Sequence, residues 1–345
     1  MKNALVTGGA GFFGGVLRNA LLQQGWHCTS VDILPDNDTQ ANLRTIQADI
    51  RSGEAMRSIF AGTKFDAVFH CAALLAHGVK SVKELFSVNV DATRQLAEFA
   101  QQAGVPSFVF ISSNCLWGRP FDHPLTEDEQ PDPVEDYGRS KWEAEKQLQS
   151  VCKAMRYSII RTPTIIEAGR LGLLAILFEF MDENRAIWVV GKGDNRYQFV
   201  YAPDLADACI RASQHSQSSV FNVGSDNVKS MREVYEYVIH QAGSKSKVRS
   251  LPKALTLLAM KIAYKLGLSP LGPYHYRMIA SSFVFDTSRI KAATGWQPTL
   301  TNEQMLARAY LYYKENRREI ESRSDASAHR KASSMGIIKL LKWIS

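Results

Sequence analysis

Short runs of apolar and β-branched residues alternate with longer helical patterns over the first 160 residues. The predicted strands lie at residues 4–6, 28–32, 45–48, 66–70, 107–112 and 157–161. Strands that are apolar on both faces and separated by helices form parallel sheets with helices on each side. We therefore expect an α/β fold with a doubly wound parallel sheet, in which ligands bind at the carboxyl ends of the strands.

A glycine-rich turn follows the first predicted strand. Gly8, Gly11 and Gly14 lie between this strand and the first predicted helix, where glycine permits a tight turn and close approach of the backbone to a pyrophosphate. Asp32 ends the second predicted strand, where a carboxylate can hydrogen-bond a ribose diol and would repel a 2′-phosphate. These features predict NAD rather than NADP as the cofactor. The alternative for Asp32 is a purely structural role at a turn or helix N-cap.

The regular alternation of strands and helices breaks down after Arg161. We expect residues 1–165, together with about 195–225, to form a Rossmann-type NAD-binding domain. Residues 166–320 are expected to form a smaller α/β substrate-binding cap interleaved with it. Residues 321–345 are Ser-rich and basic and end in a short apolar tail, so we expect a linker and tail there.

The spacing of the cysteines and the residues at the N-terminus indicate the cellular compartment of the protein. The five cysteines are far apart, and no Cys or His cluster has zinc-ligand spacing, so we expect reduced thiols and no metal site. The N-terminus lacks the residue order of a signal peptide, and no segment has the roughly 18 uncharged apolar residues of a membrane span. A cytoplasmic protein is expected, with at most peripheral contact with the inner face of the membrane.

The net charge of +7 is concentrated in the last third of the chain. Residues 1–243 have a net charge of −5, whereas residues 244–266 hold six cations and no acids. This distribution disfavours nucleic acid as a partner. The basic segment either contacts an anionic or lipid-linked substrate or forms a solvated face. The apolar and basic tail at 337–344 either lies on a membrane, packs on a partner subunit or is disordered.

We expect a tyrosine and a lysine at the start of a predicted helix to be catalytic. Tyr137 and Lys141 share one helical face, one turn apart. A phenol with a pKa of about 10 is a poor base at neutral pH, but a nearby ammonium group stabilises the phenolate. Ser113 follows the fifth predicted strand and can bond the same substrate oxygen. We therefore predict Ser113, Tyr137 and Lys141 as catalytic, with Tyr137 the general acid/base. The alternative is that two residues with this spacing simply lie on the exposed surface of a helix, without a catalytic role.

With these motifs the chain resembles the extended short-chain dehydrogenases/reductases of the NAD-dependent epimerase/dehydratase family, over about residues 2–315. The matching segments are residues 7–14, 32, 49–50, 70–73, 89, 112–113, 118, 137, 141, 199–205, 285–288 and 295–298. The resemblance implies a homodimer formed through helices at about 89–103 and 136–150.

The resemblance also assigns the cofactor contacts. It implies that Asp49 and Ile50 contact adenine and that Cys71 lies on the diphosphate and ribose side. The predicted cofactor-binding residues are Gly8, Gly11, Phe12, Phe13, Gly14, Asp32, Asp49, Ile50, Cys71, Ala72, Ala73, Tyr137, Lys141 and Pro163. Two further motif residues are expected to be structural: His70 as a packed core residue, and Asn89 as a support of the sheet, directly or through a water.

The substrate positions depart from the pattern of the family. Members that eliminate water carry an acidic pair directly after the strand-end Ser or Thr, where this chain has Asn114 and Cys115, so dehydration is disfavoured. Sugar-nucleotide epimerases commonly have Asn at the position of Thr164 and Arg at the position of Tyr197. Arg196 lies one residue from that second position. We predict Asn114, Thr164 and Arg196 as substrate-binding residues.

The predicted function is that of an NAD-dependent sugar-nucleotide epimerase, which oxidises a sugar hydroxyl and re-reduces the keto intermediate on its other face. The alternative is an NAD(P)-dependent dehydrogenase or reductase of a hydroxylated lipid, steroid-like or polyketide-like substrate, suggested by Pro163 and the apolar segment at 171–180. A noncatalytic NAD-sensing scaffold is disfavoured by the complete set of Ser113, Tyr137 and Lys141.

Overall fold

A seven-stranded sheet forms the centre of the protein in the computed structural model, which describes residues 1–75, 81–169, 174–266 and 278–322. The strand order is β10-β6-β5-β4-β1-β2-β3, and every neighbouring pair is parallel. The strands are β1 (Asn3–Thr7), β2 (His27–Asp32), β3 (Leu43–Gln47), β4 (Ala67–His70), β5 (Ser107–Ile111), β6 (Arg156–Arg161) and β10 (Ser219–Asn222). The doubly wound parallel sheet predicted from the sequence is confirmed, and all six predicted strands are present with ends shifted by at most two residues.

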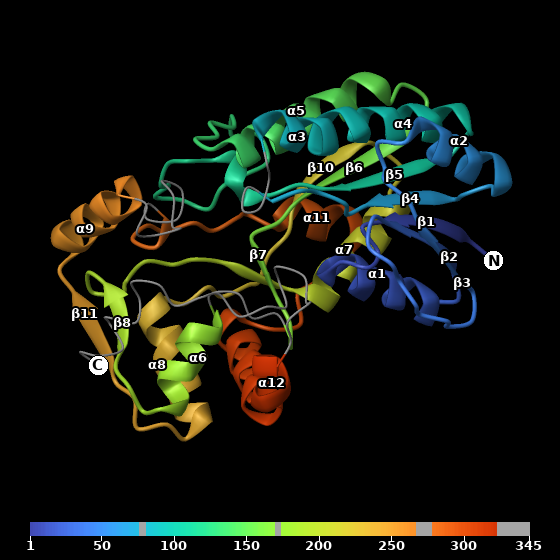
Figure 1. Cartoon of the computed structure of the whole chain (residues 1–345). Coiled ribbons are helices and arrows are strands. Elements are labelled where there is room, and N and C mark those ends of the chain that lie inside the picture. Colours follow the sequence, from blue (N-terminus) through green and yellow to red (C-terminus); the bar gives the residue numbers. More distant parts are fainter. Residues whose placement is uncertain (76–80, 170–173, 267–277, 323–345) are drawn as a thin grey trace.

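Helices cover both faces of this sheet (Figure 1). One face packs against α2 (Gly53–Gly62), α4 (Ala92–Gln102) and α5 (Asp136–Val151), and the other against α1 (Phe12–Gln23), α7 (Ala202–Gln214) and α11 (Ser288–Thr294). Side chains alternate between the two cores along each strand. In β1, for example, Ala4 and Val6 pack on the α1 side, whereas Leu5 packs on the α4 side. Burial on both faces explains the continuous apolar runs in the central strands β1, β4 and β5.

The helical segment before β5 contains an irregular turn. It consists of α3 (Val82–Phe86), a π-helical turn at Ser87–Asp91 and then α4. The turn carries Asn89, whose side chain bonds the backbone N–H and C=O of Leu74 at 2.8 and 3.0 Å and donates to Ser140 Oγ at 3.0 Å. Asn89 thus ties the loop after β4 to α5 directly, whereas the sequence predicted that it would support the sheet.

A smaller part of the chain packs against the carboxyl ends of the strands. It contains α6 (Leu174–Asp182), β8 (Ile187–Val190), α8 (Met231–Ala242), β11 (Val248–Leu251), α9 (Lys253–Lys265) and α12 (Asn302–Ser322). Its core holds a contact between Phe178 and Tyr310, with ring centroids 5.7 Å apart. Between these elements the chain returns through β9 (Phe199–Tyr201), which pairs with β7 (Thr164–Ile166), and then through α7 and β10.

The predicted C-terminal linker and tail fall mostly outside the described residues. Helix α12 extends to Ser322, two residues into the predicted linker, and residues 323–345, including the apolar tail, are not described. Among the helices that the structure describes, none is long and apolar enough to cross a lipid bilayer.

Candidate active site

The glycine-rich turn between β1 and α1 can be built only from glycine at two positions. Gly8 has a φ of +73°, in the left-handed region, and its N–H donates to Val31 O at 2.8 Å. A Cβ on Gly14 would lie 2.0 Å from Gly8 O, far closer than any real contact. Gly11 is the N-cap of α1 and has no side chain with which to cap the helix. The start of α1 therefore fits a diphosphate, because helix N-termini bind anions through backbone N–H groups.

Two carboxylates lie beyond this turn. The Asp32 carboxylate accepts from Ala10 N at 3.1 Å and from Leu34 N at 3.0 Å, so it braces the turn as well as ending β2. Asp49 is paired with Arg51 at 2.5 Å, and hydrogen bonding to Arg51 lowers the pKa of the Asp49 carboxyl. Arg51 belongs to none of the motifs in the sequence, yet it joins Asp49 in the wall of the cavity described next.

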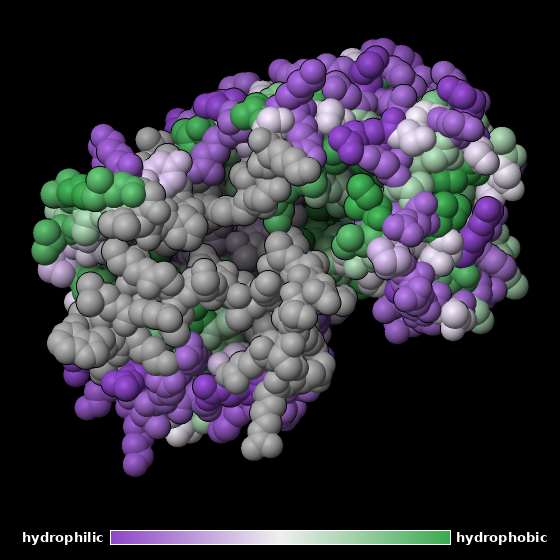
Figure 2. Space-filling model, in the orientation of Figure 1, coloured by the Kyte–Doolittle hydropathy of each residue, from purple (hydrophilic) through white to green (hydrophobic). Residues whose placement is uncertain are grey.

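A cavity of about 910 Å³ lies between the large sheet and the smaller part of the chain. Figure 2 shows the surface hollowed there. Its wall includes every predicted catalytic and cofactor residue: Gly8, Gly11, Phe12, Phe13, Gly14, Asp32, Asp49, Ile50, Cys71, Ala72, Ala73, Ser113, Tyr137, Lys141 and Pro163. Residues from the turn after β1, from β2, β5 and α5 thus converge at the carboxyl ends of the strands, as expected for a doubly wound sheet.

Tyr137 lies in the first turn of α5, and Lys141 follows one turn later. The start of α5 packs tightly against the segment after β5, since a Cβ on Gly138 would lie 2.1 Å from Cys115 O. That close approach brings the tyrosine to the wall that also holds Ser113. Ser113 Oγ accepts from Cys115 N at 3.1 Å, which leaves its O–H group able to donate to a ligand.

Lys141 is buried, with 3% of its surface exposed, and its Nζ lies 4.1 Å from the centre of the Phe110 ring. Burial lowers the pKa of Lys141 from 10.5 to about 7, although the charges of Glu145 and Cys71 act in the opposite direction. The amine is therefore poised to exchange a proton near neutral pH. A nearby group that gains negative charge would favour its ammonium form.

A buried ion pair behind Lys141 fixes the position of α5. The side chains of Glu145 and Arg161 are 0% and 4% exposed, and they are joined at 2.7 Å. Ser112 Oγ also donates to Glu145 Oε1 at 2.5 Å. These bonds connect α5 to the ends of β5 and β6. No pattern in the sequence indicates the Glu145–Arg161 pair, because the two residues are adjacent only in the fold.

His70 is a core residue, as expected. Its ring stacks on Phe110, with centroids 5.6 Å apart, and it is 1% exposed. Thr93 Oγ1 donates to Asn89 O, so it must accept from Nε2 of His70, at 2.8 Å. Nδ1 then accepts from Thr7 Oγ1 at 2.7 Å. These bonds require the neutral imidazole, and burial together with the charge of Lys141 lowers the pKa of His70 to about 3.

The other end of the cavity holds two of the three predicted substrate residues. Asn114 Nδ2 donates to the Tyr197 hydroxyl at 2.9 Å, and Thr164 Oγ1 lies 3.5 Å from the same oxygen. Arg196 is exposed and is not part of the cavity wall, although both of its sequence neighbours are. Its backbone C=O accepts from Phe283 N, and its backbone N–H donates to Ser282 Oγ. The structure therefore does not bring Arg196 to this site.

Several wall residues come from segments that carry no recognisable motif. They are largely apolar or aromatic: Leu174, Leu177, Trp188, Val189, Val190, Met231, Tyr235, Met278 and Ile279. Of these, Leu174 and Leu177 lie in the apolar segment 171–180 that the sequence had indicated. This end of the cavity therefore offers aromatic and aliphatic surface, suited to a ring or a planar base.

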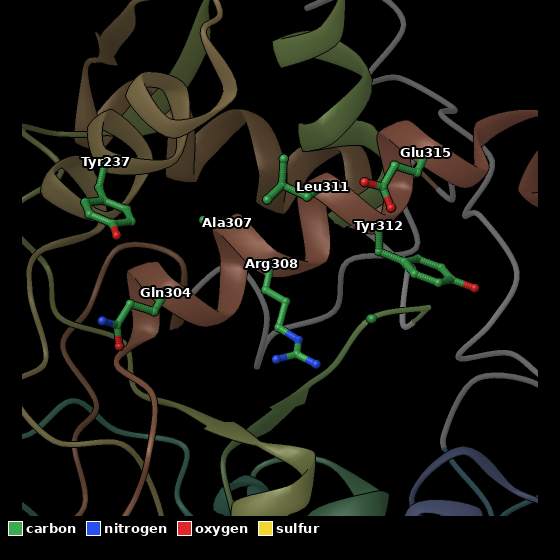
Figure 3. Close-up of a pocket in the computed structure, with 8 residues that line it drawn as sticks. Tyr237, Gln304, Ala307, Arg308, Leu311, Tyr312 and Glu315 are labelled. Atoms are coloured by element: carbon green, nitrogen blue, oxygen red, sulfur yellow. The ribbon is translucent and has the colours of Figure 1, made fainter.

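A second, shallower pocket of about 440 Å³ lies along α12 (Figure 3). Arg308 and Tyr312 line it from α12, and Tyr237 faces them from α8. It holds none of the predicted site residues. In the part of the chain that the structure describes, no group of three or more His, Cys, Asp or Glu side chains could hold a metal ion.

The fold and site define a class: enzymes that bind a dinucleotide on a Rossmann-type sheet and carry a Ser, Tyr and Lys set beside it. Residues 4–224 match the model of the NAD dependent epimerase/dehydratase family. The chain belongs to this family and is an NAD-dependent enzyme. The resemblance drawn from the motifs is confirmed.

Individual relatives agree with this assignment. The uncharacterized protein y4nG of Sinorhizobium fredii is 35% identical over 350 residues, which cover 99% of this chain and 86% of that protein. The UDP-glucose 4-epimerase of Neisseria meningitidis serogroup C is 29% identical over 355 residues, covering 92% of this chain and 98% of that enzyme. The Bordetella bronchiseptica enzyme WbmG, solved in complex with NAD and UDP, shares the fold with a TM-score of 0.74 at 20% identity, over 90% of this chain and 94% of that one.

Proposed function

We propose that this protein is an epimerase of a uridine diphosphate sugar, with Tyr137 as its general acid/base. The observation that carries the proposal is the shared wall of Ser113, Tyr137 and Lys141, in the same cavity as the glycine turn. The family membership and the similarity to a UDP-glucose 4-epimerase support it. These relatives favour epimerisation over the alternative of a lipid or polyketide reductase.

The residues of the site fit NAD, which when bound supplies an acceptor for a hydride and then returns it. The N-terminus of α1 would hold the diphosphate, and Asp32 would hold the adenosine ribose. The Tyr137 phenolate, stabilised by the Lys141 ammonium, would take the proton of one sugar hydroxyl as its carbon is oxidised. Tyr137 would return that proton to the oxygen when the ketone is reduced on its opposite face. Ser113 donates to that oxygen throughout.

The polar residues that follow Ser113 favour epimerisation over water elimination. A dehydratase needs an acid that protonates a departing hydroxyl, and the positions after Ser113 hold Asn114 and Cys115. The Asn114 amide is engaged with the Tyr197 hydroxyl and has no proton to give as an acid. We propose that Asn114, Thr164 and Tyr197 bind the sugar hydroxyls and that the apolar residues around Trp188 contact the uracil.

We further propose that the enzyme works as a homodimer in the cytoplasm, through the outer surfaces of α4 and α5. These helices pack on each other and so form one continuous surface on the outside of the sheet. The cysteines support a reducing compartment, because all five are free thiols and burial raises the pKa of Cys28 and Cys152 to about 12.

The proposal is tested on the purified full chain. Nucleotide that remains bound through gel filtration is identified after denaturation, and UDP-glucose, UDP-N-acetylglucosamine and UDP-glucuronic acid are then assayed for isomer exchange. We expect bound NAD and exchange of one of these sugars without added NADH. Continuous consumption of free NADH with a ketone, and no isomer exchange, would show a reductase instead.

A further inference from the structure

Helix α9 presents an apolar surface to solvent. Its exposed apolar residues, with their exposed fractions, are Leu255 (65%), Leu258 (55%), Ile262 (49%) and, at the C-cap, Leu266 (67%). Spacings of three and four residues place them on one face. Figure 2 shows this helix as a hydrophobic patch at the edge of the molecule. An ordinary surface helix turns its apolar stripe inward. In α9, all of whose residues are described, Ala263 alone is buried.

The surroundings of this patch are basic. Residues 244–266 contain no Asp or Glu and six cations: Lys245, Lys247, Arg249, Lys253, Lys261 and Lys265. Lys261 and Lys265 are exposed and lie one turn apart, which places them along one flank of the leucine face. An apolar face bordered by lysines is the pattern of a helix that lies in the interface of a membrane, with lysine ammonium groups reaching the headgroups.

We propose that α9 docks this enzyme on the surface of an anionic lipid bilayer, with Leu255, Leu258 and Ile262 inserted among the lipids. The charges favour this occupant over two others. A second copy of the same surface would bring two sets of cations together without acids. The C-terminal segment 335–345 is itself apolar and basic, with Lys339 and Lys342 and no acid, so it also lacks complementary charge.

The location of α9 joins this surface to the cap end of the active-site cavity. Val190 in the cavity wall pairs with Leu251 of β11, and α9 begins two residues later at Lys253. Figure 1 places α9 at the end of the molecule opposite β3. A bilayer in contact with α9 therefore lies beside the cap and away from β3, so membrane contact leaves the cofactor turn free.

The test measures co-sedimentation of the full-length protein with vesicles of phosphatidylcholine alone or mixed with phosphatidylglycerol. We expect binding to the anionic vesicles that falls with added salt, and weak binding to phosphatidylcholine. The variant Leu258→Glu/Ile262→Glu is expected to bind at least about tenfold more weakly. Lys261→Gln/Lys265→Gln should weaken binding about fivefold for each lysine replaced. Val82→Glu/Leu311→Glu, at exposed sites outside α9, is the matched control and should bind like the wild type.

Three outcomes would overturn the proposal. One is the absence of anionic-vesicle binding by the wild type. Another is binding that survives in Leu258→Glu/Ile262→Glu but is lost in the tail variant Ile338→Glu/Leu341→Glu, which would assign the membrane contact to the tail. The third is a dimer that dissociates in the α9 variant without any vesicle binding, which would make the patch a contact between copies. Vesicle binding requires no catalysis, so the result is independent of the proposed reaction.

Discussion

The Nζ atom of Lys141 lies 4.1 Å from the centre of the Phe110 ring, so this buried lysine of the cavity wall faces an aromatic surface. The ring attracts the ammonium form. Burial outweighs the opposing charges of Glu145 and Cys71 and lowers the pKa of Lys141 to about 7. The proton of Lys141 is therefore lost far more easily in the folded enzyme than in the unfolded chain.

This pKa predicts a dependence of stability on pH. An unfolded lysine keeps its proton up to a pH of about 10, whereas Lys141 in the fold releases it above about 7, so the unfolded state binds more protons in this window. The contribution of Lys141 to the free energy of unfolding should rise by about 1.4 kcal/mol per pH unit between these values. Urea unfolding of the wild type and Lys141→Met at pH 7, 8 and 9 measures the difference. A difference that does not change with pH would contradict the account.

The glycine turn predicts a graded loss of NAD affinity. A Cβ at position 14 would lie 2.0 Å from Gly8 O, and one at position 11 would lie 3.0 Å from the same atom. Gly14→Ala should therefore weaken NAD binding by about 100-fold, since it displaces charge-assisted bonds to the diphosphate, and Gly11→Ala should weaken it less. Calorimetric titration with NAD measures both. Gly62→Ala, with nothing within 4 Å of its added Cβ, is the matched control. Wild-type affinity in Gly14→Ala would place the diphosphate elsewhere.

His70 predicts a loss of stability in acid. Its pKa is about 3 in the fold and about 6.5 when unfolded, so the unfolded state binds more protons between these values. The contribution of His70 to the free energy of unfolding should therefore decrease by up to about 1.4 kcal/mol for each pH unit below 6.5. His70→Gln removes the titrating group and should show a flatter loss of unfolding free energy between pH 6.5 and 4.5. Parallel pH profiles for the two proteins would refute the neutral, buried imidazole.

Much of the cofactor half was predictable because its signals are local. The apolar run of β1, the glycines at 8, 11 and 14, and Asp32 all lie within one βαβ unit, where a short sequence determines the geometry. The Tyr137 and Lys141 spacing is equally local, because one helical turn fixes it. Ser113 was expected close to these two residues, because it follows a parallel strand and the carboxyl ends of parallel strands meet at one edge of the sheet.

The substrate half was not predictable to the same degree. Trp188, Met231 and Met278 come from three separate segments that meet only when the cap packs on the sheet. Arg196 shows the limit of reasoning from spacing, since one residue decides whether a side chain of an irregular segment points into the cavity or to solvent. The π-helical turn at Ser87–Asp91 likewise left no mark in the helical pattern.

The central claim is that Tyr137 exchanges the proton of the substrate hydroxyl, and the kinetics of Tyr137→Phe test it most directly. The change removes one oxygen, so kcat for isomer exchange should fall by about 100- to 10,000-fold. The affinity for NAD should change by less than about tenfold, because at most one neutral hydrogen bond is lost. Tyr157→Phe, at the opposite end of β6 from the cavity, is the matched control and should keep full activity. Turnover of folded, NAD-bound Tyr137→Phe at the wild-type rate would contradict the account.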